Sequence, residues 1–142
     1  VPSVVAAEGL AVRLPDGVRD LMRTFWPGAL TIVVNVAPSI PGGLTGSSGT
    51  VGLRMPAGAV AQALLTAFAG PIIGTSANKA GGADPADAKT VQKAIGGQID
   101  LILDGGRTPG GAPSTVVDCT GPQPVILRPG PILAEQIEEL FP

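Results

Sequence analysis

Short apolar segments alternate along this chain with runs of glycine, proline and polar residues. Some segments repeat apolar residues every three to four positions, as on one face of a helix, and others are β-branched or alternate with period two, as in strands. Helices are expected at residues 2–10, 15–25, 57–69, 85–95 and from Pro131 to about Phe141. Strands are expected at residues 29–36, 50–55, 71–74, 100–103, 115–119 and 125–128. This order predicts an α/β fold with a twisted mixed β-sheet flanked by helices.

Local signals predict where several of these elements begin and end. Trp26-Pro27-Gly28 is expected to stop the helix at residues 15–25. Asp84 is expected to cap the helix that follows it, with Pro85 at the first helical position, where a missing N–H has no cost. Residues 57–69 are apolar on most sides, which predicts a buried helix.

The chain has 142 residues, of which 44% are hydrophobic, and this is enough to form one buried core. The composition therefore predicts one globular domain over residues 1–142. The longest weakly polar stretch, residues 59–74, contains Gln62, Thr66 and Pro71 and is shorter than the roughly 20 residues of a membrane span. No secretion signal is visible in the sequence, so we expect a cytoplasmic location.

Charge and residue types restrict the possible chemistry. The chain has no histidine, which excludes a Ser-His-Asp triad and imidazole metal ligands, and its one cysteine excludes an internal disulfide. The net charge is −2 and the nine basic residues are scattered, so no basic stripe is expected to follow a nucleic-acid backbone. Any chemistry must therefore depend on positioning and charge.

Two arginines stand at the ends of predicted strands. Alternation in residues 50–55 puts Thr50, Gly52 and Arg54 on one face. A guanidinium offers a planar fork of donors that fits a carboxylate or a phosphate, although an internal salt bridge explains Arg54 equally well. Arg128 ends another strand before a Pro-Gly turn, and a surface ion pair is the alternative there.

Two glycine-rich segments bring polar groups to strand ends. Residues 71–82 and residues 104–118 each combine a predicted strand with glycines that permit close approach of a ligand to the backbone. An ordinary polar turn and a plain hairpin explain the same residues. The candidate side chains in the two segments are Thr75, Ser76, Asn78, Lys79, Ser114 and Thr115. Together with the arginines, they predict a cleft for a small anionic molecule.

These segments, in this order and preceded by Phe25-Trp26-Pro27-Gly28-Ala29-Leu30-Thr31, resemble the YrdC family over essentially the whole chain. Members typically carry F-W-P-G-P-L-T, T-V-G-x-R-x-P, P-[IL]-x-x-[TP]-S-A-N-x-S-G, G-x-x-S-T-[IV]-V-D and x-x-R-x-G. Ala29 and Ala80 depart from these motifs, and neither change is expected to abolish binding.

The resemblance implies the activity of an L-threonylcarbamoyladenylate synthase, which forms threonylcarbamoyl-AMP and pyrophosphate from L-threonine, bicarbonate and ATP for the modification of tRNA. It implies no catalytic side chain and no protein metal site, with Mg²⁺ carried by the nucleotide and with tRNA or tRNA-modifying proteins as further partners. The implied contacts to ATP are Thr50, Ser76, Asn78 and Arg128. The implied contacts to threonine are Arg54, through the carboxylate, and Ser114. Thr75 and Thr115 neighbour these positions and are second choices.

The family's usual opening motifs, P-T-[DE]-T-x-Y-G-L and K-x-R, do not occur in this sequence. We therefore expect the chain to be the C-terminal two thirds of a YrdC-like domain, truncated at its N-terminus. Two alternatives stay open: a module that forms carbamoyl-adenylate within a carbamoyltransferase, and a non-catalytic paralogue or fragment that binds nucleotide or RNA.

Overall fold

The computed structural model describes residues 1–141, which divide into two compact units. The sheet unit comprises Val1–Ile72 and Ala112–Pro142, and the insert unit comprises Ile73–Gly111. The insert unit is continuous in sequence and interrupts the sheet unit. The single domain expected from composition stays a prediction.

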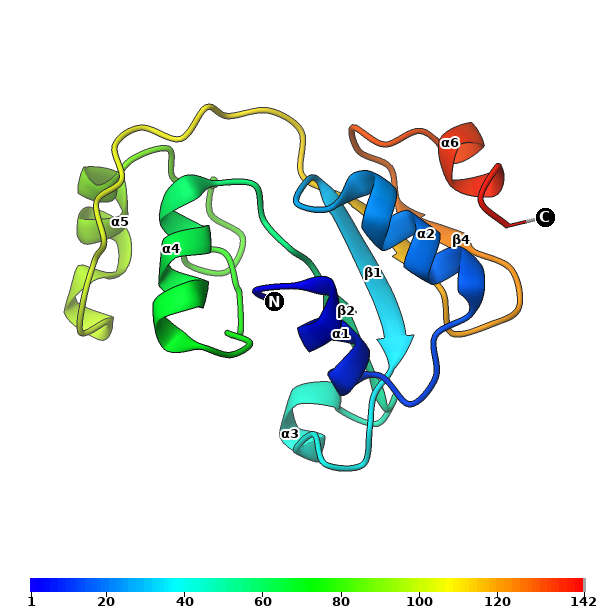
Figure 1. Cartoon of the computed structure of the whole chain (residues 1–142). Helices are drawn as coiled ribbons and strands as arrows, with labels where there is room; N and C mark the ends of the chain where they lie inside the picture. Colours follow the sequence, from blue (N-terminus) through cyan, green and yellow to red (C-terminus); the bar gives the residue numbers. More distant parts are fainter. Residues whose placement is uncertain (142) are drawn as a thin grey trace. The chain divides into compact units, whose positions relative to one another are not determined.

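The sheet unit is built on a mixed sheet of four strands in the order β2-β1-β3-β4, of which β1, β2 and β4 are labelled in Figure 1. Its strands are β1 (Leu30–Asn35), β2 (Thr50–Leu53), β3 (Thr115–Asp118) and β4 (Val125–Arg128). β1 and β3 are parallel in the centre, and each pairs on its other side with an antiparallel edge strand. The mixed α/β fold predicted from the sequence is confirmed.

The register of these strands decides which residues meet. Leu30 pairs with Thr115, so the two central strands begin at the same end of the sheet. Ile32 pairs with Leu53 and Val116 with Arg128, so the two edge strands finish at that same end. Residues just before β1 and β3 and just after β2 and β4 are therefore neighbours across the sheet.

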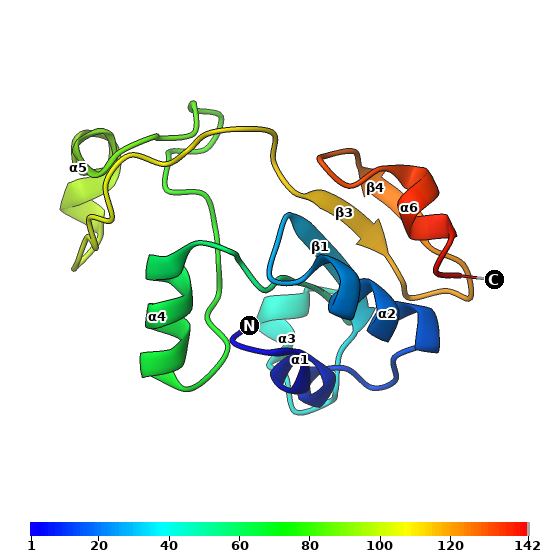
Figure 2. The ribbon, with the colours of Figure 1, turned by 45° about the horizontal axis from the view of Figure 1, so that its top comes forward.

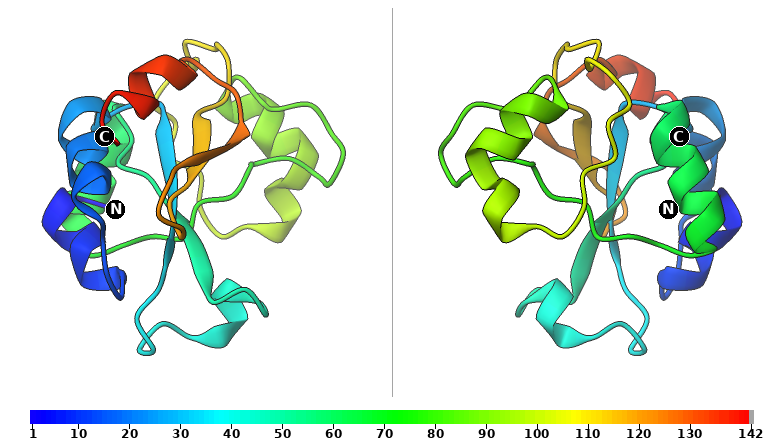
Figure 3. Two further views of the ribbon diagram at one scale, coloured as in Figure 1. Left: turned by 90° about the vertical axis from the view of Figure 1, so that its right-hand side faces the viewer. Right: turned by 90° about the vertical axis from the view of Figure 1, so that its left-hand side faces the viewer.

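One face of the sheet is covered by helices. α1 (Val4–Leu10) and α2 (Asp16–Phe25) lie on one side of the sheet (Figure 3), and α6 (Ala134–Glu138) adds Ile137 to the same core. Leu30, Ile32 and Val34 of β1 are at most 1% exposed, and they pack in this core with the apolar side of α2. The α2 residues concerned are Val18, Leu21 and Met22. Because side chains alternate along a strand, Thr31 and Val33 point to the opposite face of the sheet.

Two predicted strands are absent from the structure. Residues 71–74 and residues 100–103 are extended or irregular and take part in no ladder among residues 1–141. Their sequences have the apolar, β-branched character of strands, but a strand also needs a partner for its backbone N–H and C=O groups. The described residues pair neither segment, and the expectation of strands there was wrong.

The helix predicted at residues 57–69 forms as α4 (Ala59–Phe68), but it is not buried on most sides. Leu65 is its only buried residue, while Val60, Leu64 and Phe68 are exposed. These three residues recur every four positions and make one exposed apolar face. The prediction of a helix at these residues is confirmed, whereas the prediction that it is buried on most sides was wrong.

The helix of the insert unit, α5 (Ala88–Ile95), begins later than expected. Its N-cap is Asp87, whose carboxylate accepts from the backbone N–H and the hydroxyl of Thr90, both at 2.8 Å. These hydrogen bonds lower the pKa of Asp87, and they explain why the helix starts here and not after Asp84. The 3-10 turn η1 (Gly96–Gln98) follows α5, and the short helix α3 (Gly42–Thr45) lies between β1 and β2 in sequence. Within residues 1–141, none of the helices has the length and apolar character that a membrane crossing requires.

Candidate functional site

Arg54 stands immediately after β2 at the end of the sheet where β1 begins. Its Nε donates to the carbonyl of Gly28 at 2.9 Å, and the N–H of Gly28 donates to the carbonyl of Met55 at 2.9 Å. The turn at Trp26-Pro27-Gly28 therefore holds the Nε atom of Arg54 in place. This turn requires glycine at position 28, because a Cβ there would collide with the carbonyl of Phe25. Within the described residues Arg54 makes no ion pair, so the internal salt bridge considered for it is not formed.

Arg128, at the end of β4, is bound to Ser114, which directly precedes β3. Its Nε and Nη2 both donate to the carbonyl of Ser114, at 3.1 and 2.9 Å, and Nη2 also donates to the Ser114 hydroxyl at 3.1 Å. Ser114 is only 4% exposed. The fork of the guanidinium is thus oriented by a loop backbone and not by a carboxylate, and its Nη1 has no protein partner in the described part of the chain.

Thr31 connects this pair to the rest of the sheet, and it was not among the residues predicted from the sequence. Its hydroxyl lies 2.8 Å from that of Ser114. A Cβ built on Gly52 would lie 3.1 Å from its methyl group, so Thr31 also covers the glycine of β2. The sequence did hold a signal, because Thr31 is the one hydroxyl among the apolar residues that open this strand. Figure 2 shows β1, β3 and β4 side by side.

Four side chains, three of them predicted from the sequence, therefore lie at one end of the sheet. We call this end the arginine end. It consists of Arg54, Thr31, Ser114 and Arg128 from four adjacent chain segments. It carries two guanidinium groups without a carboxylate partner among the described residues. Such a set of donors favours an anion with several oxygens.

Thr50 lies at the other end of β2, opposite Asn35. It is separated from Arg54 by about 13 Å of extended strand, but it points to the same face. Its hydroxyl lies 2.9 Å from that of Ser48. A ligand that contacted both Thr50 and the arginine end would have to extend along the strand, across Gly52.

Thr115, a second choice in the sequence analysis, points to the opposite face of the sheet. It is fully buried, and its hydroxyl donates to the carbonyl of Ile132 at 2.9 Å and accepts from the N–H of Ile132 at 3.0 Å. Both roles of the hydroxyl are satisfied inside the protein. Thr115 therefore ties β3 to the segment before α6, and the proposed binding site does not include it.

The insert unit holds Thr75, Ser76 and Asn78. Thr75 and Ser76 are exposed and lie in an irregular segment rather than at the end of a strand. The Asn78 Nδ2 donates to the carbonyl of Gly82 at 2.6 Å, across a turn closed by a bond of 2.8 Å from the Gly82 N–H to the carbonyl of Lys79. The Oδ1 atom of Asn78 is buried and has no hydrogen-bond partner in the described residues, so it is available to accept from a donor.

Gly130 allows the segment after β4 to approach Ser114 closely. A Cβ at this position would overlap the Thr115 nitrogen and would lie 2.6 Å from the Pro113 carbonyl oxygen. Gly130→Ala is therefore expected to destabilise the fold by about 1 to 3 kcal/mol through overpacking, with a Tm lowered by several degrees. Thermal unfolding followed by circular dichroism measures this change. Gly121→Ala is the control, because the nearest atom there lies at 4.0 Å, and an equal effect of both substitutions would contradict the explanation.

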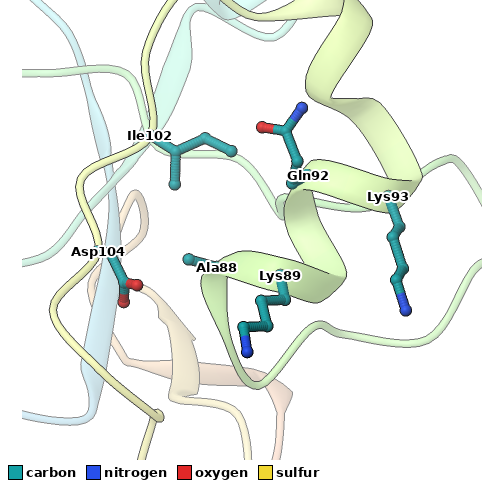
Figure 4. A pocket seen from close by; sticks show the side chains of 6 residues that line it. All are labelled: Ala88, Lys89, Gln92, Lys93, Ile102 and Asp104. Atoms are coloured by element: carbon teal, nitrogen blue, oxygen red, sulfur yellow. The ribbon is translucent and has the colours of Figure 1, made fainter.

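Two hollows lie away from the predicted residues. One, of about 440 Å³ in the insert unit, lies between α5 and the segment at residues 102–104, and its lining residues are Ala88, Lys89, Gln92, Lys93, Ile102 and Asp104 (Figure 4).

The other, of about 370 Å³, lies in the sheet unit at the end opposite the arginine end, and it is lined by Cys119 among others. Burial, and then the charge of Asp118, raise the pKa of Cys119 to about 12, so its thiol stays protonated and is a poor nucleophile.

The fold is that of a mixed α/β protein, and its arginine end presents two guanidinium groups that have no carboxylate partner among the described residues. The family model for Sua5, YciO and YrdC, described as "Telomere recombination", matches residues 1–130, and the chain belongs to this family. The resemblance to YrdC proteins found in the sequence is thereby confirmed.

Relatives and solved structures agree with this assignment. A Mycobacterium tuberculosis protein is 46% identical over 134 residues, which cover 94% of this chain and 61% of the relative. The threonylcarbamoyl-AMP synthase of Pyrococcus abyssi is 39% identical over 141 residues, 99% of this chain and 42% of the relative. The crystal structure of P. abyssi Sua5 complexed with L-threonine matches with a TM-score of 0.89 at 40% identity, over 97% of this chain and 41% of that one.

Escherichia coli YciO matches with a TM-score of 0.84 at 28% identity, over 95% of this chain and 66% of that one. The chain thus spans about 61% of the length of the M. tuberculosis relative and less of the P. abyssi protein.

Proposed function

We propose that the protein to which this chain belongs is a threonylcarbamoyl-AMP synthase. It would use L-threonine, bicarbonate and ATP to form threonylcarbamoyl-AMP and pyrophosphate, for the modification of tRNA in the cytoplasm. The observation that carries the proposal is the arginine end, where Arg54 and Arg128 stand on the two edge strands without a carboxylate partner in the described residues. The name and the threonine-bound structure of the P. abyssi relative support it.

In the proposed reaction, the amino group of threonine and bicarbonate form a carbamate with loss of water. A carbamate oxygen then attacks the α-phosphorus of ATP, the bond to the β-phosphate oxygen breaks, and pyrophosphate leaves with the bonding electrons. No protein nucleophile is needed, which agrees with a chain that has no histidine. The protein's part is to hold the two anions in line and to offset their charge.

Each residue has a proposed part in this arrangement. Arg54 would bind the threonine carboxylate, since its Nε is occupied by Gly28 and its two Nη groups remain for a bidentate contact. Ser114 would contact the same substrate. Arg128 would contact ATP with its remaining Nη1, and the other proposed ATP contacts are Thr50, Ser76 and Asn78, with Thr75 as a second choice. Lys79 lies in the same segment as Asn78.

The proposed substrate is the magnesium complex of ATP. Among residues 1–141, no group of three or more acidic, histidine or cysteine side chains gathers to hold a metal. In this proposal the phosphate oxygens would bind Mg²⁺, which suits its preference for oxygen ligands and retained water. The ion would supply part of the positive charge that ATP, with about four negative charges, requires beyond that of Arg128.

The test is the release of pyrophosphate from ATP. It is measured on the full-length protein. We expect release in the full-length protein that depends on both L-threonine and bicarbonate. Pyrophosphate release that does not change when threonine is omitted would reject the proposal.

A non-catalytic nucleotide-binding protein is the second candidate. The family model that matches this chain also covers E. coli YciO, which carries no synthase name, so membership of the family does not by itself assign synthase activity. ATP binding by calorimetry, without threonine-dependent pyrophosphate release from the full-length protein, would favour this candidate over the synthase.

A further inference from the structure

We infer that Thr31 is a positioning residue for the proposed threonine site, where it sets the direction in which the Ser114 hydroxyl donates. This inference rests on the proposed function, and it assigns a role to a residue outside the predicted set. It follows from the hydrogen bonds that converge on one oxygen atom.

Ser114 Oγ is the atom in question. A serine hydroxyl has one proton to donate and two lone pairs to accept with. The Arg128 Nη2 donates to this oxygen at 3.1 Å, and because a guanidinium is never an acceptor, one lone pair of Ser114 is certainly used. The second close contact is the Thr31 hydroxyl at 2.8 Å, a distance that fits donation in either direction.

The direction of the Thr31 contact decides what Ser114 offers a ligand. When Ser114 donates to Thr31, its proton is consumed, and it offers a ligand one lone pair. When Thr31 donates to Ser114, both lone pairs are occupied and the proton is the group that remains. Ser114 is 4% exposed, so bulk water has little part in this choice.

The proposed substrates distinguish the two directions. The carboxylate of threonine, the carbamate and the phosphates present oxygen atoms that only accept. Ser114 hydrogen-bonds to such an oxygen only with its proton, and that proton is free only when Thr31 donates. The hydroxyl of Thr31 thus makes Ser114 a donor, from β1 and without contacting the substrate.

The geometry of the sheet keeps Thr31 in place for this role. Its strand pairs in parallel with β3, where Leu30 is opposite Thr115 and Thr31 is opposite Val116. Its methyl group lies over Gly52, where a Cβ would approach to 3.1 Å. With its methyl group on the glycine side, its hydroxyl is the group that faces Ser114.

The experiment compares Thr31→Val with Thr31→Ser in the full-length protein, with the Kd for L-threonine measured by calorimetry. Valine keeps the shape and the β-propensity of threonine and removes the hydroxyl, so we expect the Kd to rise about threefold to tenfold. Serine keeps the hydroxyl, and we expect a Kd within about twofold of that of the unmodified protein. The Kd for ATP serves as the folding readout and should stay within about twofold in both variants.

A double-mutant cycle separates positioning from packing. If Thr31 acts through Ser114, then Thr31→Val causes no further loss of threonine affinity in a Ser114→Ala background. Losses that add in the double variant, an equal loss in Thr31→Ser and Thr31→Val, or no loss in Thr31→Val would each overturn the inference. Failure of the proposed function has a different signature: the unmodified protein itself binds no L-threonine, and the inference is rejected with it.

Discussion

Replacement of Arg54 by alanine is expected to raise the Kd for L-threonine by roughly tenfold to a hundredfold in the full-length protein, while the Kd for ATP changes by less than about threefold. The reason is that hydrogen bonds to charged groups contribute about 1.5 to 3 kcal/mol each, and every 1.4 kcal/mol is a factor of about ten in Kd. The Nη groups of Arg54 are the proposed carboxylate ligands, whereas its Nε is held by Gly28. Calorimetric titrations with each ligand measure the two constants.

Two controls make this result specific. Arg54→Lys keeps the charge but loses the planar fork, so it is expected to restore only part of the affinity. Arg23→Ala removes a surface arginine of α2 that pairs with Asp20, and it is expected to leave both constants unchanged. An equal loss of threonine and ATP affinity in Arg54→Ala would show that Arg54 is structural, and the assignment would be wrong.

Replacement of Arg128 by alanine is expected to weaken the binding of both ATP and L-threonine, by different factors. The Kd for ATP should rise roughly tenfold to a hundredfold, because a guanidinium contact to phosphate is lost. The Kd for L-threonine should rise by a smaller factor, because the carbonyl and the hydroxyl of Ser114 lose the donors that orient them. Titrations of both ligands against the same preparation measure the ratio of the two effects.

Arg128→Lys tests the geometry of this contact. Lysine supplies the charge but not two N–H groups in a fixed plane. It is therefore expected to restore part of the ATP affinity but little of the orientation of Ser114. Threonine affinity in Arg128→Lys should therefore stay close to that of Arg128→Ala. An Arg128→Ala variant with unchanged ATP affinity would remove Arg128 from the nucleotide site, although its bonds to Ser114 would still stabilise the loop.

The sequence predicted strands correctly where a segment has both the residue pattern of a strand and a neighbouring strand with which it pairs. β1 and β4 have dense β-branched or apolar residues between turn signals, and both form within a residue or so of their expected bounds. Residues 71–74 and 100–103 have the same character, but the described chain supplies no partner strand for them. Periodicity reports what side chains prefer, and it carries no information about which backbone is available to pair.

Three of the four members of the arginine end, Arg54, Ser114 and Arg128, were predicted from the sequence, but their assembly at one end of the sheet depends on the strand pairing. Arg54 and Arg128 stand at strand ends in the sequence itself, but only the register brings those ends together. Thr31 was missed because the hydroxyl that it contacts lies 83 residues away in the chain. Thr115 was included because it adjoins Ser114, although adjacent residues of a strand point to opposite faces.

The parallel pairing of β1 with β3 has a consequence for how this chain tolerates change. It fixes Leu30 opposite Thr115, while the insert unit lies between the two strands in sequence. The entropy of closing a flexible loop grows only slowly with length, by about 0.6 kcal/mol for each doubling. Changes in the length of residues 73–111 should therefore cost the pairing of β1 with β3 little.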